Sequence, residues 1–478
     1  MRINPAIIKA YDIRGLYPFE INKETAFLLG RAYAAFLQKK LRKKRVALSI
    51  GRDLRFSSDE LARFFTQGAT EAGADVIDIG EVTTPLNYFA VSHLRLDGGA
   101  MITASHNGPE YNGIKFIVRK GRGMFQIGKE QGLSVLPALA RKKIRNAATG
   151  IITKREVRKN YVDFLLRIVP LPRFDVFTKL KIVVDASGGS AIIVLPELLS
   201  RIGITYKPLF FERDPHFKKH SPNPLKPESQ RFVQEELKKG GYAFGVVFDG
   251  DADRVQFFDE RGRAVPNGSM LGVLAGAVLG QKKRLNQSAK PIGRPNDLNR
   301  FRESVVVLDP FISLGVEEYI RERGGVPQRV STGTAFIKEG MKKYKALLGG
   351  EYSGHFYFRE FFGSDSAFVA FLSVLKIAMR EKKIFSALTR PCERYVSRFT
   401  DLAVIKGRAG GITRAIGAYY KKKGANVKKF DGLGISFPDW RAHIRPSNTE
   451  PVLRVFVEAK SEEVLEEKMK ELLSLLKV

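Results

Sequence analysis

The chain has 478 residues, of which 44% are hydrophobic, 10% are aromatic and one is a cysteine. This length predicts three or four domains, because a single hydrophobic core rarely extends over so many residues. The apolar runs are too short to span a bilayer and no signal peptide is recognisable, so we expect a cytoplasmic protein without a membrane partner. One cysteine excludes an internal disulfide and a Cys-rich metal site.

A formal net charge of +31 comes from 81 Lys and Arg against 50 Asp and Glu. Such a charge is compatible with nucleic acid, an anionic membrane or a negatively charged small molecule as the partner. The basic residues lie in short scattered clusters without interleaved aromatic side chains, which argues against a surface that stacks nucleic-acid bases. A positive field would still attract a phosphorylated small molecule.

Three segments repeat one pattern, in which an apolar strand, an amphipathic helix and a second strand follow one another. We predict strands at 46–50, 75–79, 180–184, 204–209, 305–308 and 326–330, and helices near 59–72, 194–202 and 314–323. This repetition predicts three similar α/β domains in series, each with helices packed over a mixed sheet. The stretch from about residue 391 is expected to form a smaller α+β unit.

A further apolar strand follows each copy and ends in a loop of unusual composition. The loops read ASHN, DGDADR and EYSGH, and the last unit contributes HIRPSNTEP. In open α/β sheets, ligands bind beyond the carboxyl ends of the strands, so we expect the four loops to face one central cleft. Residues 281–302, rich in Lys, Arg, Asn and Pro, predict a basic surface insertion.

Ser105 lies directly after the strand GAMIT, in a turn punctuated by Gly and Asn. Taken alone, this loop is better explained as an ordinary polar turn than as a catalytic loop. His106, as its sequence neighbour, is poorly placed to act as the base of a catalytic triad. The chain has neither a G-x-S-x-G elbow around this serine nor a Walker A loop.

Asp249, Asp251 and Asp253 alternate along DGDADR, so their carboxylates can turn toward one small cation. Mg²⁺ prefers oxygen ligands in octahedral geometry and keeps positions for water or phosphate. Closely packed carboxylates repel one another unless a cation neutralises them. An exposed acidic turn is the alternative, whereas an EF-hand is disfavoured because the Glu at its twelfth position is missing. Arg254 could bind a phosphate oxygen.

The last two loops offer groups that bind sugars and phosphates. In GEYSGH, Glu351 and Ser353 offer a carboxylate and a hydroxyl to the hydroxyls of a sugar, although buried structural polar groups would explain the same residues. The fourth loop combines one cation with neutral donors, which suits a phosphate dianion or a capped turn. Its residues are Arg445, Ser447, Asn448 and Thr449.

In this order and at these separations, the four loops resemble those of the α-D-phosphohexomutases, over essentially the whole chain. The pairing of GEYSGH with RPSNTEP is similar to that of the bacterial phosphomannomutase/phosphoglucomutase branch. Phosphoglucosamine mutases typically carry a GEQSGH-like loop and a serine-glycine phosphate loop instead. Further similarities are KAYDIRG with Tyr11 and Arg14, GRDLRFSS at 51–58, SPNP at 221–224 and TGTAFIK at 332–338.

The resemblance implies a heart-shaped fold of four domains, namely three similar α/β domains with mixed sheets and a C-terminal α+β domain. We expect these domains at 1–153, 154–258, 259–385 and 386–478. In this order they carry the phosphoserine loop, the metal-binding loop, the sugar-binding loop and the phosphate-binding loop. We expect a monomer or a weak homodimer.

The activity that the resemblance implies is reversible phosphoryl transfer between C1 and C6 of mannose and glucose phosphates. Ser105 would be phosphorylated at rest, and one Mg²⁺ per chain would join its phosphate to Asp249, Asp251 and Asp253. A hexose 1,6-bisphosphate would be both the intermediate and an activator. The implied catalytic residues are Ser105, Lys115, Arg14, His355 and Arg254. The implied substrate-binding residues are Tyr11, Glu351, Ser353, Arg445, Ser447, Asn448 and Thr449.

Three positions depart from the pattern of the family. Gly108, Thr334 and Phe311 stand where relatives often have a proline, a histidine and a substrate-contacting lysine, so they bear on the choice of sugar.

Two other classes of function fit part of the sequence. A basic nucleic-acid-binding protein would explain the charge but leaves the four loops without a purpose, and a phosphatase would use Asp249 as its nucleophile. A catalytically silent homologue is a third possibility, yet every loop residue that the mechanism uses is present.

Overall fold

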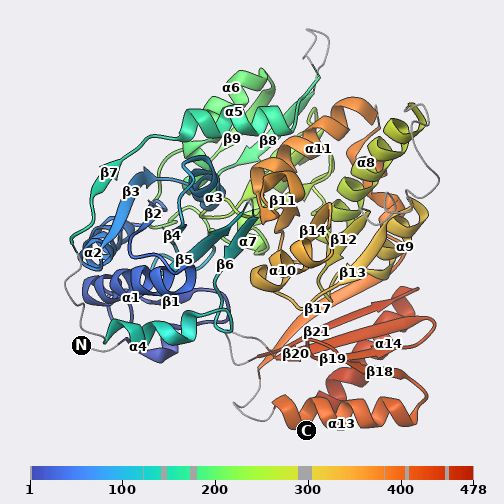
Figure 1. Cartoon of the computed structure of the whole chain (residues 1–478). Helices are drawn as coiled ribbons and strands as arrows, with labels where there is room; N and C mark the ends of the chain where they lie inside the picture. Colours follow the sequence, from blue (N-terminus) through green and yellow to red (C-terminus); the bar gives the residue numbers. More distant parts are fainter. Residues whose placement is uncertain are drawn as a thin grey trace, which may run out of the picture.

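The computed structural model of the protein contains four β-sheets that follow one another along the described chain. In Figure 1 they run from the blue strands, through green and yellow, to the red strands beside the C-terminus. The structure describes residues 3–121, 123–141, 148–172, 180–288, 304–381, 383–403, 409–446 and 452–476, with side chains at the end of α8 described only as far as residue 280.

The first sheet mixes parallel and antiparallel strands in the order β1-β5-β4-β2-β3-β7. Strands β4, β2, β3 and β7 are parallel to one another, and β5 runs antiparallel to both β4 and β1. The strands are β1 (Ile13–Leu16), β2 (Val46–Arg52), β3 (Ala74–Glu81), β4 (Gly98–Ile102), β5 (Tyr111–Lys120), β6 (Gly123–Gln126) and β7 (Ile152–Lys154). Strand β6 pairs with β5 and extends the sheet toward the third unit.

Two helices of the first unit, α1 (Lys23–Leu41) and α2 (Ser58–Glu71), pack closely because each has a glycine at the contact. A Cβ on Gly30 would lie 2.0 Å from the carbonyl oxygen of Phe65, and one on Gly68 would lie 1.9 Å from that of Phe27. No side chain fits at either position, so the two backbones touch. The helix pair packs on the sheet of this unit, and residues of both form one apolar core.

The second and third sheets repeat the central order of the first. The second is β11-β10-β8-β9 and the third is β13-β12-β14-β15-β16. In all three sheets, the opening strand of each βαβ unit lies between two parallel neighbours, and an antiparallel strand follows. The strands are β8 (Lys181–Asp185), β9 (Thr205–Leu209), β10 (Phe244–Phe248), β11 (Val255–Phe258), β12 (Val305–Leu308), β13 (Val326–Arg329), β14 (Leu348–Gly350), β15 (Phe356–Phe358) and β16 (Ser364–Asp365).

The fourth sheet is entirely antiparallel, with the strand order β17-β21-β20-β19-β18. Its strands are β17 (Val396–Ala403), β18 (Asn426–Lys429), β19 (Leu433–Ser436), β20 (Trp440–Pro446) and β21 (Val452–Ala459). Two helices of this unit, α13 (Ala409–Lys422) and α14 (Glu462–Leu476), pack on it and enclose a separate apolar core. The prediction of three similar mixed sheets and a smaller α+β unit is therefore confirmed.

The remaining α-helices belong to the first three units and lie between strands in chain order. They are α3 (Thr84–His93), α4 (Leu136–Ala140), α5 (Arg158–Ile168), α6 (Leu195–Ile202), α7 (Pro227–Lys238), α8 (Asn267–Ser288), α9 (Leu314–Glu322), α10 (Thr334–Lys343), α11 (Ala367–Glu381) and α12 (Phe385–Thr389). Each predicted strand and helix of the three repeats is confirmed, with ends that differ by a few residues.

Helix α8 departs from the predicted organisation. It continues to Ser288, so the start of the basic insertion predicted at 281–302 is helical. Residues 289–302 of that insertion lie outside the described chain. The domain limits given above, at 153, 258 and 385, stay a prediction.

One large apolar core joins the second and third units to the edge of the first. Among its members, Phe89 of α3 packs against Tyr161 of α5 with ring centroids 5.4 Å apart, and Tyr161 meets Phe368 of α11 at 6.1 Å. Polar groups are among the contacts between the fourth unit and the third. Nε of Arg441 lies 2.5 Å from the buried carboxylate of Glu458, and its Nη2 donates to the carbonyl of Ile312. These contacts fix the positions from which the loops extend.

Candidate active site

The loops that follow β4, β10 and β14 meet at one place. Ser105 Oγ lies 3.1 Å from Oδ2 of Asp249, so the first loop contacts the second. Nε2 of His355 lies 3.3 Å from Oδ1 of Asp253, so the second loop contacts the third. The predicted convergence of these three loops is confirmed, as their positions at the carboxyl ends of strands would lead one to expect.

Ser105 has a left-handed backbone with φ at 54° and a fully buried side chain. Residues other than glycine rarely adopt this conformation, and they keep it only where their surroundings fix it. Its N–H donates to Oγ1 of Thr103 at 2.8 Å, and its carbonyl oxygen accepts from Nη2 of Arg55 at 2.7 Å. Ser105 is therefore not part of an exposed polar turn.

Gly250 lets the aspartate loop approach this serine. A Cβ at Gly250 would lie 2.6 Å from the carbonyl oxygen of Ser105, so a larger residue would push the two loops apart. His106 also contacts the serine, because its Nδ1 lies 3.2 Å from Ser105 Oγ. Sequence reasoning did not expect this contact. Burial, with the positive charges of Arg254 and Arg14 added, holds the pKa of His106 well below its usual range, so the ring is neutral.

Asp249, Asp251 and Asp253 are all buried, and one carboxylate oxygen of each lies within 4.8 Å of the others. The interpretation as an exposed acidic turn is therefore wrong. Lys115 of β5 places its Nζ 2.7 Å from Oδ2 of Asp251 and 2.5 Å from Oδ2 of Asp253. Thr84, at the start of α3, donates to the same oxygen of Asp251.

The pKa values of this cluster reflect its burial and its crowding. Burial, with repulsion from Asp253 and Asp251, raises the pKa of Asp249 well above its usual range. Burial also acts to raise the pKa of Asp253, but Lys115 and His355 outweigh it and hold that pKa well below the usual range. Lys115 itself has a raised pKa, because the three aspartates overcome the effect of its burial. A cation among the carboxylates would offset the repulsion that raises the pKa of Asp249.

The residues present fit a small hard cation. Three carboxylates from one short loop supply oxygen ligands, which is the donor set that Mg²⁺ prefers. Oδ1 of Asp251 is buried and receives no hydrogen bond from any residue that the structure describes. A buried acceptor without a partner is unfavourable, so an ion at this position would satisfy it. Ser105 Oγ, beside Asp249, is near enough to contribute to the same site.

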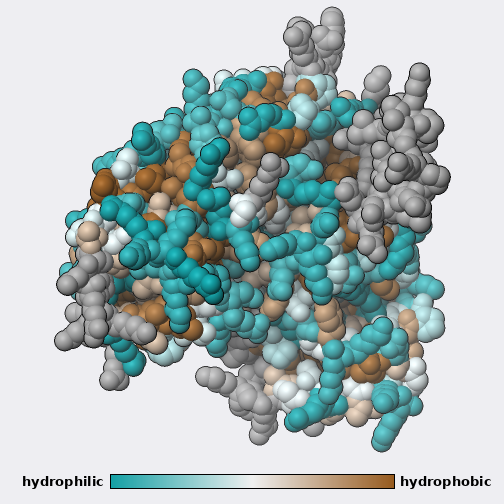
Figure 2. All heavy atoms as spheres, viewed as in Figure 1, coloured by the Kyte–Doolittle hydropathy of each residue, from teal (hydrophilic) through white to brown (hydrophobic). Residues whose placement is uncertain are grey.

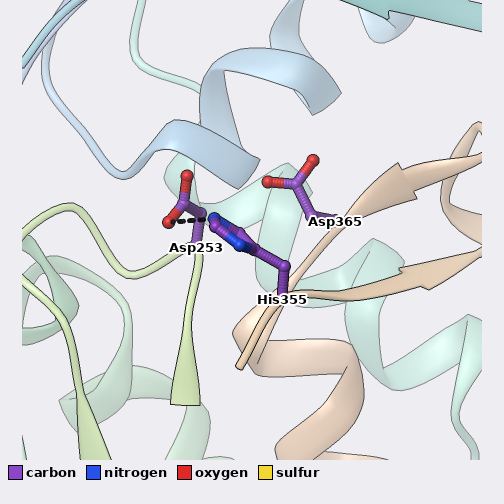
Figure 3. A group of neighbouring side chains, drawn as sticks. All are labelled: Asp253, His355 and Asp365. Carbon is purple, nitrogen blue, oxygen red and sulfur yellow. Dashed lines mark ion pairs between the residues drawn. The ribbon is translucent and has the colours of Figure 1, made fainter. Parts of the chain in front are cut away.

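His355 lies at the centre of a group of carboxylates, and Figure 3 shows it between Asp253 and Asp365. Its Nδ1 lies 3.0 Å from Oε2 of Glu351 and 2.8 Å from Oγ of Ser353. Burial and Arg254 lower the pKa of His355, but Asp253 and Glu351 outweigh them and raise it to about 9.

His355 can exchange one partner for another as it titrates. Nε of Arg254 lies 3.1 Å from Nε2 of His355, and this hydrogen bond exists only while that nitrogen is unprotonated. The protonated ring donates to Oδ1 of Asp253 instead. Nε of Arg254 also lies 3.8 Å from Oδ2 of Asp249. Three of the residues predicted to be catalytic, Lys115, Arg254 and His355, therefore contact the aspartates directly.

Asp365 and Lys338 form a buried ion pair beside His355, with Nζ 2.8 Å from Oδ1. The ammonium lies 4.0 Å above the ring of Tyr88, on α3 of the first unit. One oxygen of Asp365 lies within 4.8 Å of ligand atoms of Asp253 and His355, but Lys338 already balances its charge. Sequence reasoning missed this pair. Lys338 ends the TGTAFIK segment, which was its only signal, and Asp365 had none.

Glu351 is buried and accepts three hydrogen bonds or ion-pair contacts. Its Oε1 accepts from the N–H of Gly333 at 2.8 Å, and its Oε2 accepts from the hydroxyl of Tyr357 at 2.7 Å, in addition to the contact with His355. Burial acts to raise the pKa of Glu351, but His355 and Tyr357 outweigh it and lower that pKa. Glu351 is thus an ionised acceptor held rigidly at the end of β14.

Arg14 lies on β1, which pairs with β5 in the first sheet, and Tyr11 lies just before β1. Arg14 donates to Oδ1 of Asn107 in the serine loop and forms an ion pair with Asp12 at 2.5 Å. The hydroxyl of Tyr11 donates to the carbonyl of Thr332 in the third unit. Gly333 permits this approach, because φ is 122° there and a Cβ would lie 2.0 Å from the ring of Tyr11. Burial raises the pKa of Tyr11 to about 12.

Arg445 of β20 is buried and reaches the other loops through one carboxylate. Its Nε lies 3.1 Å from Oδ1 of Asp431, and Oδ2 of Asp431 accepts the N–H of Thr332 at 2.8 Å. Asp431 therefore joins the fourth unit to the third beside Tyr11, although nothing in the sequence singled it out. Ser447, Asn448 and Thr449 lie outside the described residues, so the fourth loop is described only as far as Pro446.

The three positions that depart from the family pattern have different surroundings. Phe311 is buried, with its ring 5.4 Å from that of Phe399 and 5.1 Å from that of His443, so it packs between the third and fourth units. Thr334 is nearly buried at the start of α10 and hydrogen-bonds the hydroxyl of Tyr357. Gly108 turns its carbonyl oxygen toward Nη1 of Arg55, at 2.6 Å.

No helix of the described chain has the length and apolar character that a bilayer crossing requires. On the face drawn in Figure 2, hydrophilic side chains cover most of the surface and the hydrophobic patches between them are small.

The chain matches four domain families in sequence order. The first three are described as phosphoglucomutase/phosphomannomutase, alpha/beta/alpha domain I, domain II and domain III, and they match residues 5–132, 159–262 and 269–395. The fourth is described as the phosphoglucomutase/phosphomannomutase C-terminal domain and matches residues 397–475.

Individual proteins are similar to the chain over nearly their whole length. A phosphomannomutase of Escherichia coli is 33% identical over 479 residues, which covers 98% of each chain. A phosphoglucomutase of Neisseria gonorrhoeae is 32% identical over 465 residues, which covers 96% of this chain and 94% of the relative. A solved structure of a phosphoglucomutase/phosphomannomutase family protein from Burkholderia thailandensis superposes with a TM-score of 0.85 at 28% identity, covering 99% of this chain and 98% of that one.

Proposed function

The chain belongs to the phosphoglucomutase/phosphomannomutase family and catalyses reversible phosphoryl transfer on hexose phosphates, and we propose that Ser105 carries the phosphoryl group. The observation that supports this role is the contact of 3.1 Å between Ser105 Oγ and Asp249, within a buried cluster of three aspartates. A nucleophile beside a site for a cation is what phosphoryl transfer requires.

The transfer has two balanced steps. In the first, the free hydroxyl oxygen of a sugar monophosphate attacks the phosphorus of phosphorylated Ser105, the bond to the serine oxygen breaks, and the hydroxyl loses its proton to a base. In the second, the serine oxygen attacks the other phosphoryl group of the resulting 1,6-bisphosphate, and the released sugar oxygen takes up a proton. The serine is phosphorylated again, and the phosphate of the sugar has changed position.

Lys115 and His355 are suited to different parts of this chemistry. The raised pKa of Lys115 keeps it charged, so it would stabilise the transferred group and not accept a proton. His355, with a pKa of about 9, carries its proton at neutral pH, so it would donate the proton that the released sugar oxygen takes up. Arg254 and Arg14 would contact phosphate oxygens, because each places a guanidinium at the border of the serine and aspartate loops.

The family is metal-dependent, and we propose one Mg²⁺ per chain, held by Asp249, Asp251, Asp253 and the phosphate of Ser105. When bound, this ion supplies positive charge that offsets the negative charge of the transferred group. We also propose a hexose 1,6-bisphosphate as activator, since it can phosphorylate a serine that has lost its phosphate.

The substrate must bind in two opposite orientations, so one part of the site has to bind the sugar and another the phosphate that is not transferred. Glu351 and Ser353 would accept and donate hydrogen bonds to the sugar hydroxyls, and Arg445 would bind the distal phosphate with Ser447, Asn448 and Thr449. Tyr11 would close the cleft, because it joins the first unit to the third. We propose a cytoplasmic protein that acts as a monomer or a weak homodimer and binds neither nucleic acid nor a membrane.

One assay tests the proposal. The purified protein is given mannose 1-phosphate or glucose 1-phosphate, with Mg²⁺ and a catalytic amount of glucose 1,6-bisphosphate, and the 6-phosphate is measured. We expect both to be converted, and we expect phosphate from labelled bisphosphate to be trapped on Ser105. Label on Asp249 would instead identify a phosphatase-type nucleophile, and tight nucleic-acid binding that weakens steeply with salt would support the other class of function.

A further inference from the structure

Arg55 lies in the short loop between β2 and α2, and its side chain is only 2% exposed. Nε forms an ion pair with Oδ2 of Asp53 at 3.0 Å. Among the residues that the structure describes, the two terminal nitrogens donate to main-chain carbonyl oxygens of the segment that carries Ser105. These bonds go to Ser105 at 2.7 Å, Asn107 at 2.7 Å, Gly108 at 2.6 Å and Tyr111 at 3.3 Å.

The turn around Ser105 needs contacts of this kind to keep its conformation. The backbone at Ser105 is left-handed, and a serine keeps this conformation only where its surroundings enforce it. Carbonyl oxygens of four residues in this segment lie close enough together to accept from one side chain. A guanidinium is the side chain that can serve them, because its five N–H donors form a rigid planar fork.

Arg55 is itself held in place from three sides. Oδ1 of Asp53 accepts the N–H of Arg55 at 3.1 Å and the hydroxyl of Ser58 at 2.5 Å, which fixes the carboxylate. Nδ2 of Asn112, on β5, donates to the same hydroxyl at 3.0 Å. From the second unit, the ring of Phe217 lies 5.0 Å from the guanidinium carbon. Residues of the first and second units, whose loops meet at Ser105, therefore both hold Arg55 in position.

We propose that Arg55 is a positioning residue for phosphoryl transfer, which it serves by holding the serine turn so that Ser105 Oγ stays beside Asp249. The proposal rests on the proposed role of Ser105. Arg55 donates to the backbone of the turn and not to the hydroxyl itself, so its effect falls on the geometry of the transfer and not on the binding of the sugar. A displacement of about 1 Å at a reacting group can reduce a rate by about 100-fold.

Arg55→Lys is the informative variant, because it keeps the charge and loses the fork. A single ammonium cannot reach four separated carbonyl oxygens, so the turn should relax. We expect kcat to fall by about 100-fold, while KM for glucose 1-phosphate stays within about threefold of the wild-type value. The rate at which glucose 1,6-bisphosphate phosphorylates the serine, followed by intact mass, should fall in parallel with kcat.

Arg119→Lys is the matched control. Arg119, on β5 of the same unit, also donates to main-chain carbonyls, those of Leu96, Arg95 and Gly121, away from the serine turn. We expect this variant to keep the wild-type kcat. The proposal would be overturned if kcat fell equally in the two variants, or if Arg55→Lys raised KM and left kcat unchanged. A kcat of Arg55→Lys within threefold of the wild-type value would also overturn it.

Two further measurements distinguish a failure of the role proposed for Arg55 from a failure of the role proposed for Ser105. If Ser105→Ala is inactive while Arg55→Lys has the wild-type rate, only the role of Arg55 fails; if Ser105→Ala is active, the assignment of the serine fails. Should Arg55→Lys not fold, Asp53→Asn decides the matter, since it retains the size of the side chain but weakens the ion pair. A kcat reduced by about tenfold at unchanged KM supports the proposal, and an unchanged kcat overturns it.

Discussion

Ser105 Oγ lies 3.1 Å from Oδ2 of Asp249, although 144 positions separate the two residues in the chain. The contact forms because β4 and β10 end at the same cleft and because Gly250 lets the two turns approach. A serine hydroxyl beside a carboxylate would be a weak nucleophile taken alone. Within a cluster of three aspartates and Lys115, the same hydroxyl lies where a transferred phosphoryl group would be neutralised.

Replacement of Ser105 by alanine should lower turnover by several orders of magnitude, because it removes the oxygen that carries the phosphoryl group. Intact mass spectrometry of the wild-type protein should show a fraction about 80 Da heavier, from one phosphate, and the variant should lack it. Ser474→Ala, at an exposed serine of α14, is the control and should keep both the activity and the heavier species. Near-normal turnover of Ser105→Ala would contradict the covalent mechanism.

Asp251→Asn should cripple turnover and weaken the response to Mg²⁺ while the fold stays intact. Asparagine matches the size of aspartate and can still accept from Thr84, but it removes one negative charge from the cluster and from the partner of Lys115. A titration of activity against Mg²⁺ concentration measures the effect. The control is Asp163→Asn, at a half-exposed aspartate of α5 that pairs with Arg201. Wild-type activity of Asp251→Asn at saturating Mg²⁺ would rule out this role.

Arg445→Ala should act mainly on the binding of the phosphate that is not transferred. We expect a raised KM for glucose 1-phosphate and a loss of about 2 to 5 kcal/mol in kcat/KM, comparable to removal of one partner from a buried charge pair. The variant also leaves Asp431 without its cation, so far-UV circular dichroism must confirm that it is folded. Arg398→Ala, at an exposed pair on β17, should change neither constant. An unchanged KM in Arg445→Ala would refute the assignment.

His443 should make the fourth unit less stable in mild acid. Burial, partly offset by its hydrogen bond to the carbonyl of Asp431, lowers the pKa of His443 from 6.5 to about 4. The unfolded chain therefore takes up a proton below about pH 6.5 that the folded protein does not, so stability is complete above that pH and is lost as the pH falls toward 4. Between pH 7.5 and pH 5 the loss should be about 2 kcal/mol.

Trp440 makes this loss measurable, because it is the single tryptophan of the chain and lies on β20 with His443. Urea unfolding followed by its fluorescence should shift to lower urea at pH 5 in the wild type, and the shift should be smaller in His443→Gln. His93→Gln, at an exposed histidine of the first unit, should behave like the wild type. Equal shifts in His443→Gln and the wild type would mean that another group is responsible.

The sequence predicted the parts of this protein that depend on local patterns. Apolar strands such as β10, in which all five residues are buried, predicted the repeated sheets, and the polar loops after them predicted the site. Asp249, Asp251 and Asp253 could be identified because their spacing brings them together within one loop. The net charge of +31, by contrast, was compatible with several kinds of partner and identified none of them.

The sequence could not predict contacts between distant segments that lack a recognisable spacing. Asp431 joins Arg445 to Thr332, and Lys338 pairs with Asp365, but no periodicity links these positions. Arg55 lies within GRDLRFSS at 51–58, a segment whose only signal in the sequence is its resemblance to the family. Its role depends on carbonyl oxygens, which every residue carries, so sequence patterns contain no signal for it.

The choice of sugar follows from which hydroxyls the site can bind. The resemblance to the family implies that Glu351 and Ser353 bind O3 and O4. Glucose and mannose share these hydroxyls, because the two sugars differ only at C2. Two positions that bear on the choice of sugar make contacts within the protein and not with the hydroxyl at C2. Phe311 packs between the third and fourth units, and Thr334 hydrogen-bonds Tyr357. A hydroxyl without a partner supplies little discrimination.

We therefore expect kcat/KM for glucose 1-phosphate and mannose 1-phosphate to agree within about tenfold, with galactose 1-phosphate, whose O4 is inverted, far poorer. Glucosamine 1-phosphate should also be a weak substrate. Ser353→Ala should reduce the preference for glucose over galactose, because it removes a hydroxyl that would report on O4. Phe311→Leu is the control and should leave the ratio of glucose to mannose unchanged, since its ring lies among Phe399 and His443. A glucose-to-mannose ratio beyond about 100-fold would mean that another residue binds the hydroxyl at C2.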